Sequence, residues 1–338
     1  MELPTNNATN NDSTVSPSTA AVYASRQNVI GVATLILLFC GSACVTLVYF
    51  SDVPGIGSTA AVASAATTEA NTDAFAEIQL QARAAYVKDL ATNKVLYTLH
   101  SDTQLPLASL TKIATVLAVS EVLPSDTVIT IPRDTAPYGS VERLAAGQKW
   151  LLHDVTNFTL VASSNGGAEI LAEAANGAIH AKYPQSPEVA ATLWRMNDLA
   201  RTLHLDATYF LNASGLDIST TLAGAYGSAH DIADLFAYAA SHNPGIFEGT
   251  ARDGMLLTSV DGSHTSAYNT DQALGSIPGL VMGKTGYTDL AGGNLAILFD
   301  IGLSHPVVAV ILGSSYDGRF ADMKKLIAAS QVAVSQEH

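Results

Sequence analysis

Cysteine is almost absent from this sequence, and basic residues are outnumbered by acidic ones. The only two cysteines among 338 residues, Cys40 and Cys44, lie in one apolar stretch, so the rest of the chain has no disulfide framework. A lipoprotein cysteine at Cys44 is an alternative, but Gly41 stands where a leucine is expected. Sixteen lysines and arginines face 30 aspartates and glutamates, giving a net charge of −14. This balance argues against a nucleic-acid-binding surface.

Charged residues are missing altogether from Val29 to Phe50, an apolar run that is long enough for a helix to cross a bilayer. Arg26 precedes the run, and the next basic residue after it is Arg83. The positive-inside rule therefore predicts a cytoplasmic N-terminus and an extracytoplasmic remainder. We predict an uncleaved anchor helix over 28–50 in a cell membrane. A cleaved signal peptide is the alternative, because small residues follow the run.

The rest of the chain divides by composition. Residues 1–27 are rich in Asn, Thr and Ser, which predicts a disordered cytoplasmic tail. Residues 51–75 are rich in Ala, Ser, Thr and Gly, which is typical of a flexible linker outside the membrane. Residues 76–338 carry the apolar periodicity of one globular domain.

Within that domain, hydrophobic spacing predicts strands near both ends and helices between them. The predicted strands are 84–89, 94–99, 280–283, 294–299 and 306–312, and the predicted helices are 109–123, 154–162, 167–175, one opening at Ser186-Pro187-Glu188, one capped by Ser228 with Asp231, and one from about 320. We therefore expect an α/β (α+β) fold. Its N- and C-terminal segments would share one sheet, and a helical insertion would form a cleft beside it.

Three short strings could supply the chemistry of such a cleft. The first is Ser109-Leu110-Thr111-Lys112, in which the spacing places a serine and a lysine on one helical face. A serine hydroxyl is a weak nucleophile until a base takes its proton. A neutral lysine amine can be that base if burial or a second cation lowers its pKa by about 3 from about 10.4.

The other two strings offer partners for that pair. Ser163-Ser164-Asn165 lies on a predicted turn, where a hydroxyl could relay a proton and an amide could hold a carbonyl or the lysine. Lys284-Thr285-Gly286 follows a predicted strand and could bind a carboxylate, with the N–H of Tyr287 available to an oxyanion. Taken alone, each string is more typical of a helix cap or a turn. Their occurrence together and in this order is typical of active-site-serine penicillin-binding proteins and β-lactamases.

Longer stretches strengthen this likeness. The segments Pro106–Lys112, Ala136–Ser140 with Leu144–Gly147, Phe210–Asp217 and Lys284–Gly293 resemble the motifs of the D-alanyl-D-alanine carboxypeptidases, the low-molecular-mass penicillin-binding proteins. The resemblance covers about 80–336. One departure is Gly166-Gly167, which follows Asn165 where the family often has an acidic or amide residue and then small ones. The resemblance implies a β-lactamase-like antiparallel sheet flanked by helices.

The same resemblance implies roles for the site residues. It implies that Ser109 forms an acyl-enzyme with Lys112 as its base. Ser163, Asn165 and Lys284 would handle proton transfer and substrate placement. The substrate-binding strand would comprise Lys284, Thr285, Gly286, Tyr287 and Thr288, with the two threonines beside the substrate carboxylate and the N–H groups of Ser109 and Tyr287 forming an oxyanion hole. The partners implied are peptidoglycan stem peptides and, as covalent inhibitors, β-lactams. No metal or cofactor is implied, and the nine histidines show no metal-ligand spacing.

Alternatives to carboxypeptidase activity stay open. Shorter members of the family include DD-endopeptidases, which would use the same residues to cut peptidoglycan cross-links. A β-lactamase would need an additional glutamate for deacylation, and no Glu-x-x-Leu-Asn pattern lies between Asn165 and Lys284. A catalytically silent wall-binding module would have lost at least one catalytic group, and none is missing.

Overall fold

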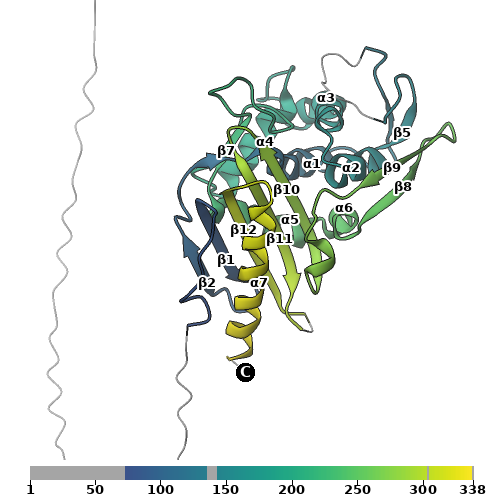
Figure 1. The fold of residues 1–338 in the computed structure, drawn as a ribbon. Helices are drawn as coiled ribbons and strands as arrows, with labels where there is room; N and C mark the ends of the chain where they lie inside the picture. The colour runs from purple at the N-terminus through teal and green to yellow at the C-terminus, as the bar shows by residue number, and fades with distance from the viewer. Residues whose placement is uncertain (1–72, 135–142, 303, 337–338) are drawn as a thin grey trace, which may run out of the picture. The chain divides into compact units, whose positions relative to one another are not determined.

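The computed structural model describes residues 73–134, 143–302 and 304–336 (Figure 1). The predicted tail, the predicted anchor helix at 28–50 and nearly all of the predicted linker lie outside these residues, as does the whole Ala136–Ser140 segment. Among the described residues, we find no helix with both the length and the hydropathy of a membrane span.

Five antiparallel strands form the central sheet, in the order β10-β11-β12-β1-β2 (Figure 1). The N-terminal strands are β1 (Ala84–Asp89) and β2 (Val95–Leu99), and the C-terminal strands are β10 (Leu280–Thr288), β11 (Gly292–Asp300) and β12 (Pro306–Ser314). The strand from the start of the domain therefore pairs with the last strand. This confirms the prediction that one sheet is built from both ends.

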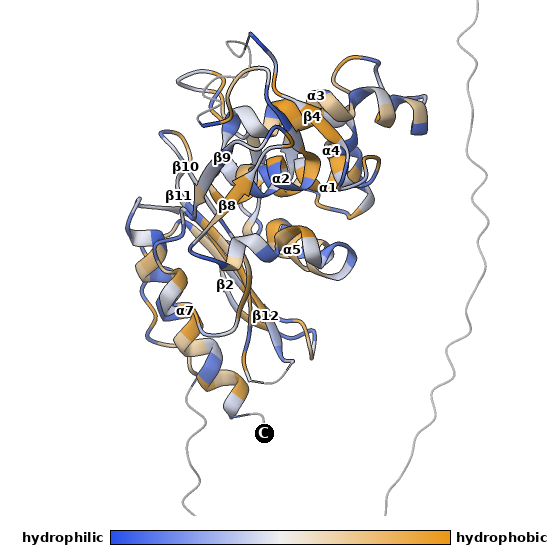
Figure 2. Ribbon diagram, turned by 90° about the vertical axis from the view of Figure 1, so that its right-hand side faces the viewer, coloured by the Kyte–Doolittle hydropathy of each residue, from blue (hydrophilic) through white to orange (hydrophobic). Residues whose placement is uncertain are grey.

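Both faces of this sheet are covered. Successive residues along a strand face opposite sides of the sheet, and here they alternate between two hydrophobic cores. On β1, Ala84 and Tyr86 belong to the core shared with the helical insertion, whereas Ala85 and Val87 belong to the core beneath α7 (Gly318–Ser335). Figure 2 shows apolar residues along β12 and a mixture of apolar and hydrophilic residues around α7. The sheet is thus the middle layer of three, which explains why its strands read as nearly continuous apolar runs.

The helical insertion separates the two halves of the sheet in sequence. Its α-helices are α1 (Lys112–Ser120), α2 (Leu152–Val161), α3 (Asn165–Lys182), α4 (Ala191–Thr202), α5 (Ala229–His242) and α6 (Pro244–Phe247). Short turns and strands connect them: β3 (Leu105–Pro106), η1 (Ala108–Thr111), β4 (Val128–Thr130), β5 (Lys149–Leu151), β6 (Tyr209–Phe210), β7 (Ala225–Gly227), η3 (Glu248–Ala251), β8 (Gly254–Thr258), β9 (His264–Tyr268) and η4 (Leu274–Ser276). Every residue of α1 from Lys112 to Val119 is buried, so this helix is the centre of the insertion.

The helix boundaries confirm the predicted cap at Ser228 and correct the predicted helix start at Ser186. Ser228 caps α5 by accepting a hydrogen bond from the N–H of Asp231 at 3.0 Å, as its spacing predicted. The helix start predicted at Ser186 is wrong, because α4 begins at Ala191 after Ala190, which has a left-handed φ of 61°. The Ser186 hydroxyl instead donates to the carbonyl of Tyr183 at 2.7 Å, in the turn that follows α3.

Candidate active site

The nucleophile candidate Ser109 lies on η1, a single 3₁₀ turn that leads into α1. Ala108 holds the turn in an unusual conformation, with a φ of 48° that an alanine rarely adopts. Thr111 closes the turn by donating its hydroxyl to the Ala108 carbonyl at 2.7 Å. Gly215 packs directly on this carbonyl, and a Cβ at that position would lie only 1.9 Å from the oxygen. The chain around Ser109 is therefore strained and tightly confined.

Lys112 is completely buried and its amine has three close partners. Its Nζ lies 2.7 Å from Ser109 Oγ, 2.8 Å from Asn165 Oδ1 and 2.7 Å from the carbonyl oxygen of Ser214. Burial, followed by the positive charge of Lys284, lowers the pKa of Lys112 well below its usual value, while Glu169 acts in the opposite direction. The second cation that the sequence pointed to thus acts on Lys112 as expected.

The second string, Ser163-Ser164-Asn165, lies on the turn between α2 and α3, where it caps α3 and places two side chains at the cleft. Ser164 caps α3 by accepting a hydrogen bond from the N–H of Gly167 at 3.0 Å. Its two neighbours are thereby left to face the cleft, with Asn165 against Lys112 and Ser163 against Lys284. Ser163 has a φ of 57°, so this string, like the first, holds a non-glycine residue in the left-handed region.

The third string lies within a strand, not after one. The sequence predicted a strand over 280–283, but β10 continues to Thr288 and pairs with β11 along its whole length. Lys284 is 2% exposed, and its Nζ donates to Ser163 Oγ at 2.9 Å and to the carbonyl of Thr285 at 2.8 Å. Burial and the nearby charge of Arg319 lower the pKa of Lys284 to about 7, against the opposing effect of Asp271.

Glycine at position 286 allows β10 to pass close to the nucleophile turn. A Cβ there would lie 3.0 Å from the carbonyl oxygen of Leu107 and 3.2 Å from the backbone nitrogen of Ser109. Asn294 on the neighbouring strand secures the same approach, because its Nδ2 donates to the Pro106 carbonyl at 3.0 Å. The backbone of Ser109 and the substrate-binding strand are therefore adjacent.

These segments enclose a cavity of about 200 Å³. Its lining comprises Ser109, Ser163, Asn165, Leu216, Thr270, Thr285, Gly286, Tyr287, Thr288, Tyr316 and Arg319. Lys112 and Lys284 lie behind this lining and reach it through Ser109 and Ser163. All nine sequence-predicted site residues thus meet at one place, although they come from three separate segments.

The sequence reasoning missed two contributors. Arg319, at the start of α7, is 2% exposed, lines the cavity and donates from Nη1 to the Gly286 carbonyl at 2.7 Å. Its Nε is buried without a hydrogen-bond partner. The other contributor is the carbonyl of Ser214, which accepts from Lys112. A basic residue among the apolar positions of the last helix was the only sequence signal for Arg319, and a backbone carbonyl gives none.

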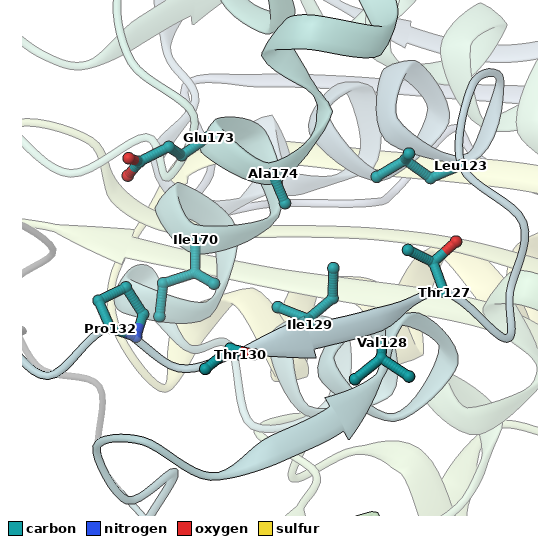
Figure 3. Close-up of a pocket in the computed structure, with 9 residues that line it drawn as sticks. All are labelled: Leu123, Thr127, Val128, Ile129, Thr130, Pro132, Ile170, Glu173 and Ala174. Carbon is teal, nitrogen blue, oxygen red and sulfur yellow. The ribbon is translucent and has the colours of Figure 1, made fainter.

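A larger hollow of about 310 Å³ lies elsewhere, between β4 and α3 (Figure 3). Leu123, Ile129 and Ile170 line it together with Thr127, Val128, Thr130, Pro132, Glu173 and Ala174. This lining includes neither a serine nor a lysine. Chemistry, not volume, therefore identifies the cavity at Ser109 as the candidate site. Within the described residues, no three His, Cys, Asp or Glu side chains are grouped so as to hold a metal ion.

Comparison with known proteins gives consistent matches. A family model described as D-alanyl-D-alanine carboxypeptidase matches residues 66–315. D-alanyl-D-alanine carboxypeptidase DacF of Bacillus subtilis is 30% identical over 74% of this chain, which spans only 62% of that relative's length. A D-alanyl-D-alanine endopeptidase of Escherichia coli is 27% identical to this chain. The match covers 81% of this chain and 83% of the length of that relative. The ampicillin-bound crystal structure of a penicillin-binding protein from Listeria monocytogenes superposes with a TM-score of 0.63 and 28% identity, over 75% of this chain and 98% of that one.

Proposed function

Since the chain belongs to the D-alanyl-D-alanine carboxypeptidase family, we propose that it is a membrane-anchored serine DD-carboxypeptidase. Its substrate is a peptidoglycan stem peptide, from which it removes the terminal D-alanine through an acyl-enzyme on Ser109. The proposal rests on the family match and, above all, on the surroundings of the Lys112 amine.

Those surroundings suit a neutral amine. Two of the partners of Lys112 Nζ, the Asn165 amide oxygen and the Ser214 carbonyl, can only accept hydrogen bonds. The third, the Ser109 hydroxyl, can donate. A neutral lysine amine has two N–H groups and one lone pair, so each partner meets its complement. The lone pair then faces the Ser109 proton, which is the arrangement a general base needs.

From this arrangement we derive the acylation step. Ser109 Oγ attacks the carbonyl carbon of the penultimate residue while Lys112 takes its proton. The N–H groups of Ser109 and Tyr287 stabilise the oxyanion. The C–N bond to the terminal D-alanine breaks as Ser163, held by Lys284, passes its proton to the departing amine and takes in return the proton that Lys112 accepted. Water then hydrolyses the ester, which restores the Ser109 hydroxyl and releases the shortened peptide.

The carboxylate of the leaving D-alanine needs cationic and hydroxyl donors. Arg319 supplies a buried positive charge beside the cavity, and the Thr285 hydroxyl lines it. The same donors suit the carboxylate of a penicillin. This supports inhibition by β-lactams, as does the likeness to a structure that contains ampicillin.

The anchoring part of the proposal rests on the apolar run over 28–50 and the scarcity of basic residues after it. Its test is carbonate extraction of membranes from cells that express the full chain, followed by protease treatment of intact spheroplasts. An anchored extracytoplasmic domain resists extraction and is digested from outside. Release by carbonate, or protection from the protease, would contradict the anchoring.

The test of the activity uses the full chain in mild detergent with a monomeric pentapeptide that ends in D-Ala-D-Ala. Mass spectrometry should find loss of one alanine, and ampicillin should add its mass to the peptide that contains Ser109. Ser109→Ala abolishes both results. The matched control is Ser241→Ala, an exposed serine on α5, which retains both. Product formation by Ser109→Ala would refute the assigned nucleophile.

A DD-endopeptidase is the second candidate, favoured by the E. coli relative, which the chain matches over 83% of its length. The chemistry at Ser109 is the same, and only the leaving group differs. Cross-linked muropeptide dimers distinguish the two activities, because an endopeptidase converts them to monomers. A carboxypeptidase leaves the dimers intact while trimming pentapeptides.

A further inference from the structure

Asp217 joins the two sides of the active-site cavity. It follows Leu216, which lines the cavity from the helical insertion, and it reaches the end of β10 on the opposite side. Its Oδ1 accepts a hydrogen bond from the Thr288 hydroxyl at 2.9 Å, and its Oδ2 accepts one from the N–H of Leu290 at 3.2 Å. One carboxylate oxygen is therefore bound by the last residue of the strand that is proposed to bind substrate, and the other by the turn that follows this strand.

This contact determines the direction of a single proton. An ionised carboxylate only accepts hydrogen bonds, so the one hydroxyl proton of Thr288 must point to Asp217. The same hydroxyl oxygen accepts from the N–H of Ala291 at 3.2 Å. What Thr288 offers to the cavity is then a lone pair, which repels a second carboxylate.

Thr285 differs in this respect. Its hydroxyl pairs with the hydroxyl of Thr270, and either oxygen can be the donor. Thr270 can therefore donate to Thr285, which leaves the Thr285 proton for a substrate carboxylate. Of the two threonines that the family resemblance places beside the substrate carboxylate, only Thr285 retains a proton to give.

We propose that Asp217 is a specificity-determining residue, which holds the Thr288 hydroxyl proton away from the cavity and so weakens the selection of leaving groups that carry a free carboxylate. The inference rests on the proposed function, because it concerns the subsite for the leaving group. Asp217 thereby reduces the preference for a terminal D-alanine and lets the subsite take leaving groups whose carboxylate is amidated or absent.

Asp217→Asn tests the proposal because it can reverse the direction in which the Thr288 hydroxyl proton points. The asparagine oxygen can still accept from Leu290 while its NH₂ group donates to the Thr288 oxygen. The Thr288 proton then turns to the cavity, where it can meet a carboxylate. One hydrogen bond to a charged group stabilises a complex enough to change the acylation rate at least about tenfold.

The measurement is the second-order rate of acylation of the full chain by benzylpenicillin and by its methyl ester, which lacks the charge. We expect the ratio of the acid rate to the ester rate to rise at least about tenfold in Asp217→Asn. The matched control is Asp289→Asn, which removes one exposed negative charge beside Thr288 and leaves the hydroxyl contact in place. An unchanged ratio in Asp217→Asn, or an equal rise in the control, would overturn the proposal.

Thr288→Val provides a second test that does not depend on Asp217→Asn folding correctly. If the wild-type hydroxyl gives the ligand no proton and presents only a lone pair, its removal does not lower the acid-to-ester ratio. A tenfold fall would show that the proton serves the ligand and would refute the inference. A wild-type chain that benzylpenicillin does not acylate at Ser109 would contradict the proposed function as well. An acylated chain whose ratio does not respond contradicts this inference alone.

Discussion

Replacement of Lys284 by methionine tests the electrostatics of the site through stability. Methionine keeps an unbranched side chain of similar length and removes the amine from a position that is 2% exposed. Burial, followed by the charge of Arg319, lowers the pKa of Lys284 from 10.5 to about 7. At about 1.4 kcal/mol for each pKa unit, this corresponds to about 5 kcal/mol against the buried ammonium form. The wild-type protein carries this penalty whenever Lys284 is protonated in the folded state.

The sign of the pH dependence follows from proton binding. Because the folded-state pKa is the lower one, the unfolded chain binds more protons between about pH 7 and 10.5. The unfolding free energy of the wild type therefore rises with pH across this interval, and the penalty is fully present below pH 7. Relative to wild type, Lys284→Met should be most favourable at pH 6 and lose roughly 3 kcal/mol of that advantage by about pH 9.5. The lost contacts with Ser163 and Thr285 add a cost that does not depend on pH.

Urea unfolding of both proteins, followed by tryptophan fluorescence at several pH values between 6 and 9.5, measures this difference. The matched control is Lys149→Met, which removes an exposed lysine from β5 and should give a difference that is constant with pH. If the difference between Lys284→Met and wild type is also constant, or grows with pH, the reasoning about a buried ammonium group is wrong.

Three further predictions concern the nucleophile turn and the two lysines. Lys112→Arg should slow penicillin acylation of Ser109 at least about 100-fold, because a guanidinium keeps its proton and cannot act as base; a near-normal rate by stopped-flow fluorescence would remove Lys112 from the mechanism. Gly215→Ala should lower the unfolding free energy by about 2 kcal/mol or more, since its φ is +78° and the new Cβ would lie 1.9 Å from the Ala108 carbonyl oxygen; an unchanged urea midpoint would contradict that contact. If the reaction needs a positive charge at position 284, the wild-type acylation rate should decline above about pH 7, where Lys284 loses its proton. Lys284→Arg should remove that decline at a lower absolute rate, and an identical decline in both proteins would assign it to another group.

The sequence predicted the sheet and the site strings well because those features are local. Strands buried on both faces are apolar runs, and a serine three residues before a lysine on a helix has a fixed geometry. The strained turn at Ala108 and the 3₁₀ geometry of the first helical residues were not predicted, because this turn packs closely against Gly215, which is distant in sequence. The continuation of β10 to Thr288 was missed for a similar reason. Its Gly283, Lys284 and Gly286 belong to residue types that are depleted in strands, and they obtain their pairing from β11.

Long-range contacts account for what the sequence did not reveal about the site. Arg319 reaches the Gly286 carbonyl on β10 only because α7 packs back against β11 and β12. The carbonyl of Ser214 meets Lys112 only because the Asn212–Gly215 turn folds over α1. Neither partner is distinguishable from its neighbours in a linear pattern. The catalytic residue types were therefore predictable, whereas the groups that tune them were not.

In the proposed mechanism the two buried lysines carry the acylation chemistry, but they do not choose between a carboxypeptidase and an endopeptidase. Both activities need the same neutral Lys112 beside Ser109 and the same proton route through Ser163 and Lys284. In the proposed mechanism the choice depends on the groups that surround the leaving group, which are the donors Arg319 and Thr285 and the Thr288 hydroxyl, whose proton Asp217 holds. If Asp217→Asn raises the carboxylate selectivity as proposed, the same variant should shift the full chain toward free pentapeptides and away from cross-linked dimers whose leaving residue has an amidated carboxylate or none. Mass spectrometry of a mixed muropeptide digest measures that shift directly, and an unchanged product ratio would mean that groups outside this cavity select the substrate.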